Sequence, residues 1–287
     1  MRTDRIDLLA RQAARCRRNV VRMVRASGAG HLGGAMSCLD IMTVLYFQTM
    51  RHDPKNPLMS DRDRFVLSAG HKCMALYSVL AETGYFDKSV LDTYGSLNTK
   101  IPGHPDMHKL PGVEANTGAL GHGLSIATGM ALGLRADETG ARVFTLLGDG
   151  ELPEGSNWEA AAAAAHYHLD NLVAVADCNG LQISGRTAEI MNMEPLSDRF
   201  ASFGWAVLEI DGNDLRQIVQ ALDNLPLESG KPTMIVARTI KGKGLSFAEG
   251  NAAYHYWKPS AEEQAQAEAE LDEAIARLEG RGKCHGN

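Results

Sequence analysis

Short, continuous apolar runs alternate along the chain with longer segments whose apolar residues recur every three or four positions. The continuous runs are typical of strands buried on both faces, and the recurring pattern is typical of amphipathic helices. The runs predict strands at 64–68, 142–147, 172–176, 206–210 and 233–238. The recurring pattern predicts a helix before each of the last four strands, at 121–136, 154–168, 197–203 and 214–225. This alternation indicates an α/β fold with a mainly parallel β-sheet and helices on both faces.

The segments at either end of the chain are also predicted to be helical. An amphipathic helix with arginines on its solvated face is expected near residues 8–25, followed by a glycine-rich turn at 27–37 and an apolar helix at 39–50. The polar segment at about 260–280 has apolar residues at helical spacing and predicts a C-terminal surface helix. Because no repeat or composition break divides the chain, we expect a single domain over residues 1–287.

Composition and charge exclude several classes of protein. A hydrophobic content of 44% can supply a large core, and a formal net charge of -6 gives no field that would attract nucleic acid or an anionic membrane. The chain has no apolar run of membrane-spanning length, and its start lacks the apolar centre of a secretory signal. The five cysteines are scattered without a CxxC pair, which predicts reduced thiols and no zinc site. These features favour a cytoplasmic protein and make nucleic-acid and membrane partners unexpected.

Polar side chains follow two successive predicted strands. Asp149 lies in the block GDGELPEG after strand 142–147, and Asn179 lies in the sequence DCNG after strand 172–176. If the two strands are parallel neighbours, a carboxylate and an amide oxygen lie side by side, and such oxygens suit Mg²⁺ or Ca²⁺. A helix beginning at Glu154 would offer free N–H groups to a phosphate. Together these residues fit a cation that bridges a diphosphate, whereas each glycine-containing motif alone is also common in plain strand-ending turns.

Several motifs resemble N-terminal segments of transketolases and occur in the transketolase order. GDG followed about thirty residues later by an asparagine is similar to the thiamine diphosphate signature. The other matching motifs are GAGHLGGAMS around His31, LSAGHKCMALY around His71, PGHPD around His104, LPGVEANTGALGHG at 110–123, and TIKGKGLSF with Tyr254 and His255. The matches run from near residue 15 to near residue 258, and they imply a thiamine diphosphate-binding fold of the diphosphate-binding type.

The resemblance implies a role for each matching residue. The expected cofactors are thiamine diphosphate and Mg²⁺, or Ca²⁺ in its place, with the metal held by Asp149, Asn179 and the backbone carbonyl of Leu181. The other residues expected to contact the cofactor are His71, Gly118, Leu120, Gly150, Glu154 and His255. The residues expected to take part in catalysis are His31, His104, His255 and Glu154. Imidazoles suit this role because ketol transfer moves protons near neutral pH.

The resemblance also implies a partner chain. Transketolases are usually longer single chains whose second domain holds the aminopyrimidine and supplies an activating glutamate. The present chain resembles only the first part, which implies the N-terminal subunit of a split transketolase, a transferase of aldehyde or ketone residues. Such a subunit is active only with a C-terminal, pyrimidine-binding subunit, and we expect an α2β2 heterotetramer that moves a two-carbon ketol unit from a ketose to an aldose. Glu154 and Glu159 match glutamates that connect the active sites across the dimer.

Three alternatives remain open on the sequence. They are the first component of a 2-oxo acid dehydrogenase, a synthase that uses pyruvate as donor, and a non-catalytic binding or regulatory paralogue. The PGHPD motif argues against the first, and the presence of both metal-binding side chains argues against the last. Some residues depart from the family pattern and predict a reshaped substrate pocket, namely Ala119, His122, Tyr256 and Trp257.

Overall fold

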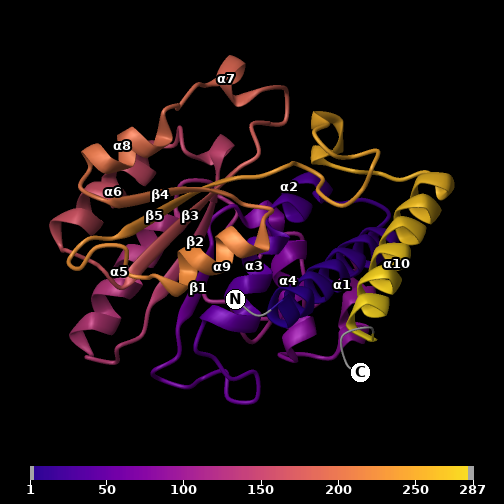
Figure 1. Cartoon of the computed structure of the whole chain (residues 1–287), viewed down its shortest axis with the longest axis horizontal. Helices are drawn as coiled ribbons and strands as arrows, with labels where there is room; N and C mark the ends of the chain where they lie inside the picture. The colour runs from indigo at the N-terminus through magenta and orange to yellow at the C-terminus, as the bar shows by residue number, and fades with distance from the viewer. Residues whose placement is uncertain (1–2, 284–287) are drawn as a thin grey trace.

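The computed structural model describes residues 3–283, and its centre is one parallel sheet (Figure 1). The strands are β1 Arg64–Leu67, β2 Val143–Gly148, β3 Leu172–Cys178, β4 Ala206–Asp211 and β5 Thr233–Arg238. Their order is β1-β2-β3-β5-β4, and every neighbouring pair is parallel. Every residue of β2 and β3 is buried, which explains why the two strands are continuous apolar runs. The predicted fold class is confirmed.

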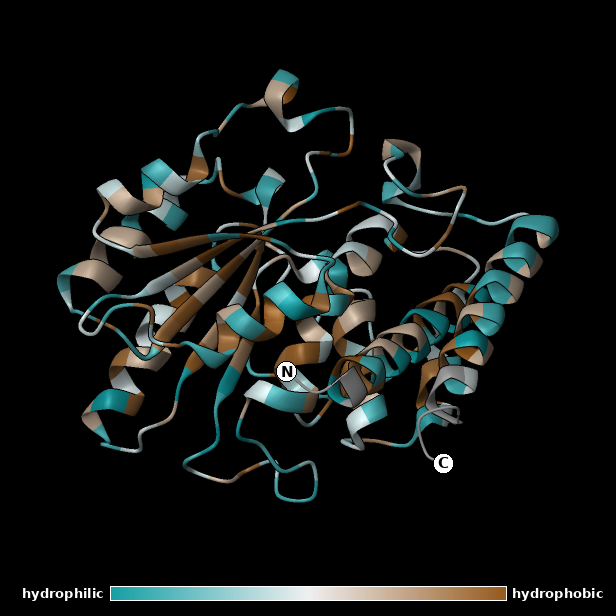
Figure 2. Ribbon diagram, viewed as in Figure 1, coloured by the Kyte–Doolittle hydropathy of each residue, from teal (hydrophilic) through white to brown (hydrophobic). Residues whose placement is uncertain are grey.

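Helices cover both faces of this sheet. Their bounds are α1 Thr3–Ser27, α2 Leu32–Ser37, α3 Leu39–Val44, α4 Cys73–Thr83, α5 Gly123–Ala136, α6 Gly155–His166, α7 Thr187–Ile190, α8 Leu196–Ser202, α9 Leu215–Asp223 and α10 Ala261–Lys283. Alternate residues of β2 point to opposite sides, because Phe144 packs in a cluster with α1, α3, α4 and α9, whereas Val143 packs in another with α5, α6 and α8. Figure 2 shows the apolar strands enclosed between these helical layers.

The glycine-rich segment after α1 differs from the prediction of a turn. Residues 32–37 form the short helix α2, which is entirely buried. A Cβ atom on Gly33 would lie 2.9 Å from the Lys241 side chain, and one on Gly34 would lie 3.2 Å from Lys72. The glycines therefore allow two lysine side chains to approach the helix closely.

The helix α4 was not predicted from the sequence, because its apolar residues form a continuous run and do not recur at helical spacing. Gly84, which follows its last residue, caps the helix with a φ of 95°.

The C-terminal helix α10 packs along α1 at one end of the molecule (Figure 1). Ala267 and Leu271 are buried in this contact. The arginines of α1 were predicted to lie on a solvated face. Some of them form ion pairs with acidic residues of α10, as Arg18 does with Asp272 at 2.8 Å. Such exposed pairs contribute about 0–1 kcal/mol each, so the apolar contact is the main stabilising part.

The described part of the chain contains no helix that is both long and apolar enough to cross a membrane. The thiols within it, on Cys16, Cys38, Cys73 and Cys178, are free and buried. Cys284 lies outside the described residues.

Candidate active site

A cavity of about 310 Å³ opens where β2 and β3 end. Gly148 is the partner of Asp177 in the strand register, so the loop that begins at Asp149 lies beside the loop that contains Asn179. Nine of the predicted site residues line the cavity, and they are His31, His71, Gly118, Leu120, Asp149, Gly150, Asn179, Leu181 and His255. The structure thus brings together residues from five separate motifs. His104 and Glu154 lie outside the lining.

Asp149 is held against the Asn179 loop by backbone groups. Its Oδ2 accepts a hydrogen bond from Gly180 N at 2.6 Å, and its Oδ1 accepts one from Gly150 N at 2.9 Å. Burial, followed by the charge of Asp177, raises the pKa of Asp149 to about 6. The N–H groups and Lys72 oppose this shift without cancelling it. The chain itself therefore balances the negative charge of this carboxylate only in part. A site of this kind can receive a cation.

The oxygen atoms near Asp149 complete a donor set that suits a hard cation. Asn179 Oδ1 accepts from Leu181 N at 3.2 Å, and the Leu181 carbonyl accepts from Lys241 Nζ at 3.1 Å. Carboxylate, carboxamide and backbone oxygens are the ligands that Mg²⁺ and Ca²⁺ prefer. No group of three or more His, Cys, Asp or Glu side chains among residues 3–283 forms another metal site. These residues fit the predicted cation.

Three histidines line the cavity, and a fourth, His104, lies next to them. The ring of His31 lies 5.6 Å from His71, 6.3 Å from His104 and 5.6 Å from His255, and His71 stacks on His255 at 5.5 Å. Burial, with a contribution from Lys72, lowers the pKa of His71 to about 2. Burial, with a contribution from Lys241, lowers the pKa of His255 to about 4. These two imidazoles are therefore neutral at physiological pH and can both donate and accept a hydrogen bond.

Two backbone hydrogen bonds fix the position of this cluster. Gly30 N donates to Trp257 O at 2.9 Å, and Trp257 N donates to Gly30 O at 2.8 Å, which forms an antiparallel bridge. The bridge ties the loop before His31 to the segment that follows His255. It also sets Tyr256, one of the departures from the family pattern, at 4.9 Å from the ring of His31. The tyrosine is 55% exposed and lies outside the lining of the cavity.

His104 and Glu154 occupy different places from the cavity residues. His104 lies beside the histidine cluster, and a Cβ atom on Gly118 would meet its ring at 3.0 Å. Glu154 is exposed, precedes the first residue of α6 and packs beside Gly121, so this chain alone does not bring it to the cavity. Glu159 is exposed on the same helix. Ala119 and His122 are also exposed, with His122 Nδ1 donating to the Leu120 carbonyl at 3.0 Å.

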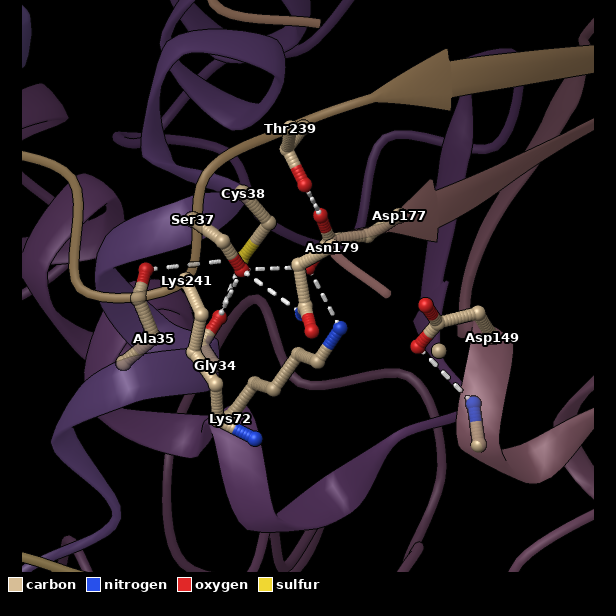
Figure 3. Close-up of polar contacts among 12 residues, drawn as sticks. Gly34, Ala35, Ser37, Cys38, Lys72, Asp149, Asp177, Asn179, Thr239 and Lys241 are labelled. Atoms are coloured by element: carbon tan, nitrogen blue, oxygen red, sulfur yellow. Dashed lines mark hydrogen bonds and ion pairs between the residues drawn. The ribbon is translucent and has the colours of Figure 1, made fainter. Parts of the chain in front are cut away.

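Two buried lysines belong to the site but were not predicted from the sequence. Lys72 Nζ lies 2.6 Å from Asp177 Oδ2, and both side chains are almost completely buried (Figure 3). Burial alone would lower the pKa of Lys72, but the Asp177 carboxylate raises it above its ordinary value. Lys241 lies 3.0 Å from His255 Nδ1 and also lines the cavity. Their only sequence signal is a lysine next to apolar or glycine residues in the motifs GHKCMALY and IKGKG.

The carboxylate of Glu151 also belongs to the site and was not predicted from the sequence. Glu151 is buried, and its side chain accepts hydrogen bonds from Gly121 N at 2.9 Å, Gly148 N at 3.1 Å and the Ser68 hydroxyl. Burial raises the pKa of this group. The contacts join the ends of β1 and β2 to the loop before α5, so Glu151 holds the wall of the cavity in place.

A protein-family model described as transketolase, thiamine diphosphate binding domain, matches residues 9–274. The chain belongs to the transketolase family. It is the thiamine diphosphate-binding part of a transketolase-type transferase, as the motifs predicted. The solved transketolase of Campylobacter jejuni superimposes with a TM-score of 0.86 at 32% identity, covering 97% of this chain and 46% of that chain. The chain thus spans about half the length of the solved transketolases that it matches.

Other members of the transketolase family have nearly the same length as this chain. An apulose-4-phosphate transketolase subunit of Phocaeicola vulgatus is 43% identical over 96% of this chain and 97% of its own length. The 6-deoxy-6-sulfo-D-fructose transketolase subunit SqwG of Clostridium sp. is 44% identical over 95% of this chain and 98% of its own length. These relatives act on different sugars, as their names state.

Proposed function

We propose that the chain is the N-terminal subunit of a two-chain transketolase that transfers a two-carbon ketol unit from a ketose to an aldose. The observation that carries the proposal is the cavity that Asp149 and Asn179 line together with His31, His71 and His255. Relatives that are themselves named as transketolase subunits, and that have nearly the same length, support the division into two chains. The partner in this proposal carries the pyrimidine-binding domain, and two copies of each chain form an α2β2 heterotetramer with two active sites.

The diphosphate end of the cavity is proposed to hold Mg²⁺, or Ca²⁺, through Asp149, Asn179 and the Leu181 carbonyl. His71, His255 and Gly150 face the diphosphate in this arrangement, and Gly118 and Leu120 face the aminopyrimidine. Lys241 adds a cation on the same wall, which favours a ligand with several negative charges. Thiamine diphosphate, when bound, supplies the carbon nucleophile that takes up and releases the ketol unit.

The histidines are proposed to handle the sugar. His31 and His255 line the cavity, His104 lies next to His31, and each imidazole can move a proton to or from a sugar hydroxyl. Burial lowers the pKa of His31 and His255, so they begin as neutral acceptors of a proton. The ring of Tyr256 lies 4.9 Å from that of His31 and would contact the same substrate.

The face of α5 and α6 is proposed to meet the partner chain. Many exposed positions on and beside these helices are small or acidic, namely Ser125, Gly129, Gly133, Glu154, Gly155, Glu159 and Ala162. Small residues permit close approach of another backbone, and the two glutamates lie where a dimer contact would connect the active sites. Larger apolar residues of these helices, such as Met130 and Trp158, are partly buried in the chain itself. A cytoplasmic location stays a prediction.

The test uses the chain alone and the chain purified with the product of a neighbouring reading frame that carries a pyrimidine-binding domain. Ketol transfer is assayed from free and phosphorylated ketoses, with pyruvate as an additional donor to test the synthase alternative. We expect no turnover by the single chain and activity on mixing. Full turnover by the single chain would contradict the two-chain proposal, and exclusive use of pyruvate would replace the transketolase assignment.

A further inference from the structure

Ser37, at the end of α2, links the buried Asp177 to Asn179, which lines the cavity (Figure 3). Its Oγ lies 2.5 Å from Asp177 Oδ2 and 3.4 Å from Asn179 Nδ2. Ser37 and Asp177 are completely buried, so solvent does not compete for these contacts. None of the motifs in the sequence connects Ser37 with the metal ligands, from which it is separated by more than a hundred residues.

The direction of each hydrogen bond follows from the Asp177 carboxylate, which can only accept. The Lys72 ammonium donates to Oδ2 at 2.6 Å, and the Thr239 hydroxyl donates to Oδ1. A serine hydroxyl has one proton, and Ser37 has two acceptors within reach, Asp177 Oδ2 and the Gly34 carbonyl at 3.0 Å. The shorter, charge-assisted bond to the carboxylate takes the proton. Ser37 Oγ therefore presents only lone pairs to Asn179.

A hydroxyl that presents only lone pairs selects one of the two orientations of the Asn179 carboxamide. The amide nitrogen must face Ser37, because the carbonyl oxygen would meet another acceptor there. Asn179 Oδ1 is consequently turned away from Ser37, toward the loop where it accepts from Leu181 N. The opposite orientation would direct an N–H₂ group at a metal ion and would repel it.

We propose that Ser37, held by the Lys72–Asp177 ion pair, is a positioning residue that presents the carboxamide oxygen of Asn179 to the metal ion. The inference rests on the proposed function, because the ligand is Mg²⁺ together with thiamine diphosphate. Ser37 touches neither the metal nor the substrate in this proposal. Residues that orient metal ligands typically change metal affinity by about 10- to 100-fold when they are replaced.

The test measures Mg²⁺ affinity by calorimetry in the presence of thiamine diphosphate, using the assembled two-chain enzyme. Ser37→Ala is expected to weaken Mg²⁺ binding by about 10- to 100-fold. Thr239→Val is the matched control, because it removes the other hydroxyl from the same carboxylate but does not contact Asn179; its affinity should stay close to that of the wild type. Ser37→Cys preserves the side-chain size with a weaker hydrogen-bonding group, and should shift the affinity in the same direction if Ser37→Ala does not fold.

A double-mutant cycle separates orientation from general support of the fold. Asn179→Asp places two oxygens on the side chain, so that neither orientation directs an N–H₂ group at the metal. In that background, adding Ser37→Ala should not weaken Mg²⁺ binding further. The role of Ser37 would be overturned if the losses of Mg²⁺ affinity in the two single variants added up in the double variant. It would also be overturned if Thr239→Val lost as much Mg²⁺ affinity as Ser37→Ala. Failure of the wild-type enzyme to bind Mg²⁺ and thiamine diphosphate would instead overturn the proposed function, and this inference with it.

Discussion

Lys241 donates a hydrogen bond from Nζ to the backbone carbonyl oxygen of Leu181 over 3.1 Å. This oxygen is also the third predicted metal ligand, so Lys241 and the metal ion would share one acceptor atom. Burial, followed by the charge of Lys72, lowers the pKa of Lys241 to about 8 and outweighs the attraction of Asp149 and Asp177. We expect the ammonium to leave the carbonyl when the metal binds and to turn to the diphosphate.

Lys241→Met should stabilise the cofactor-free chain and weaken its binding of thiamine diphosphate. The stabilisation is expected because the substitution removes a buried cation whose charged form is disfavoured. Thermal unfolding without cofactor and calorimetry with cofactor measure the two effects. Lys243→Met is the control, since Lys243 forms a surface pair with Glu249 at 3.3 Å and should change neither quantity appreciably. Unchanged cofactor affinity in Lys241→Met would show that this ammonium does not face the diphosphate.

Asp149→Ala should reduce the affinity for Mg²⁺ and thiamine diphosphate more than any other single substitution in the cavity. The carboxylate is the one charged member of the predicted ligand set, and without it the diphosphate charge is poorly neutralised. We expect a loss larger than the roughly 100-fold that follows the removal of a residue that only orients a ligand. A titration of the two-chain enzyme measures it, with the exposed Asp198→Ala as the control for charge. Wild-type affinity in Asp149→Ala would exclude this site.

His104→Ala should lose turnover while keeping the affinity for the cofactor. His104 lies outside the cavity lining, yet its ring is 6.3 Å from that of His31, in a position to contact a sugar. The expected loss in kcat is about 10²- to 10⁴-fold, the usual span for a group that transfers a proton. The exposed His108→Ala in the same loop is the control and should behave as the wild type. An equal fall in cofactor affinity would assign His104 to cofactor binding instead.

Acidification should destabilise the chain below about pH 6.5, the ordinary pKa of histidine. The unfolded chain then takes up protons on His71 and His255, whereas the folded chain does not, because their pKa values are about 2 and about 4. The free energy of unfolding therefore falls as the pH drops from 6.5 toward 4. Thermal unfolding at pH 7 and pH 5 measures the slope. His71→Asn should unfold with a smaller difference between these two conditions, and an unchanged difference would contradict the low pKa of His71.

The sequence predicted the parts of the site that depend on neighbouring strands. Asp149 and Asn179 follow two continuous apolar runs, and parallel pairing of these runs was enough to bring them together. The contact between Ser37 and Asp177 could not be predicted, because the residues are 140 positions apart and only tertiary packing joins them. Lys72 was missed since lysine is rarely buried, and its burial depends on the distant Asp177. Gly33 indicated a turn, whereas its role is to admit Lys241 beside a helix.

The bridge between Gly30 and Trp257 has a consequence for biosynthesis. It joins two positions more than two hundred residues apart, so the histidine cluster cannot close until translation has passed Trp257. Contacts of such long sequence separation form late, because the entropy of closing the intervening loop is lost before the contact is gained. Nascent chains that stop before Trp257 therefore lack this bridge and leave the loop before His31 untied.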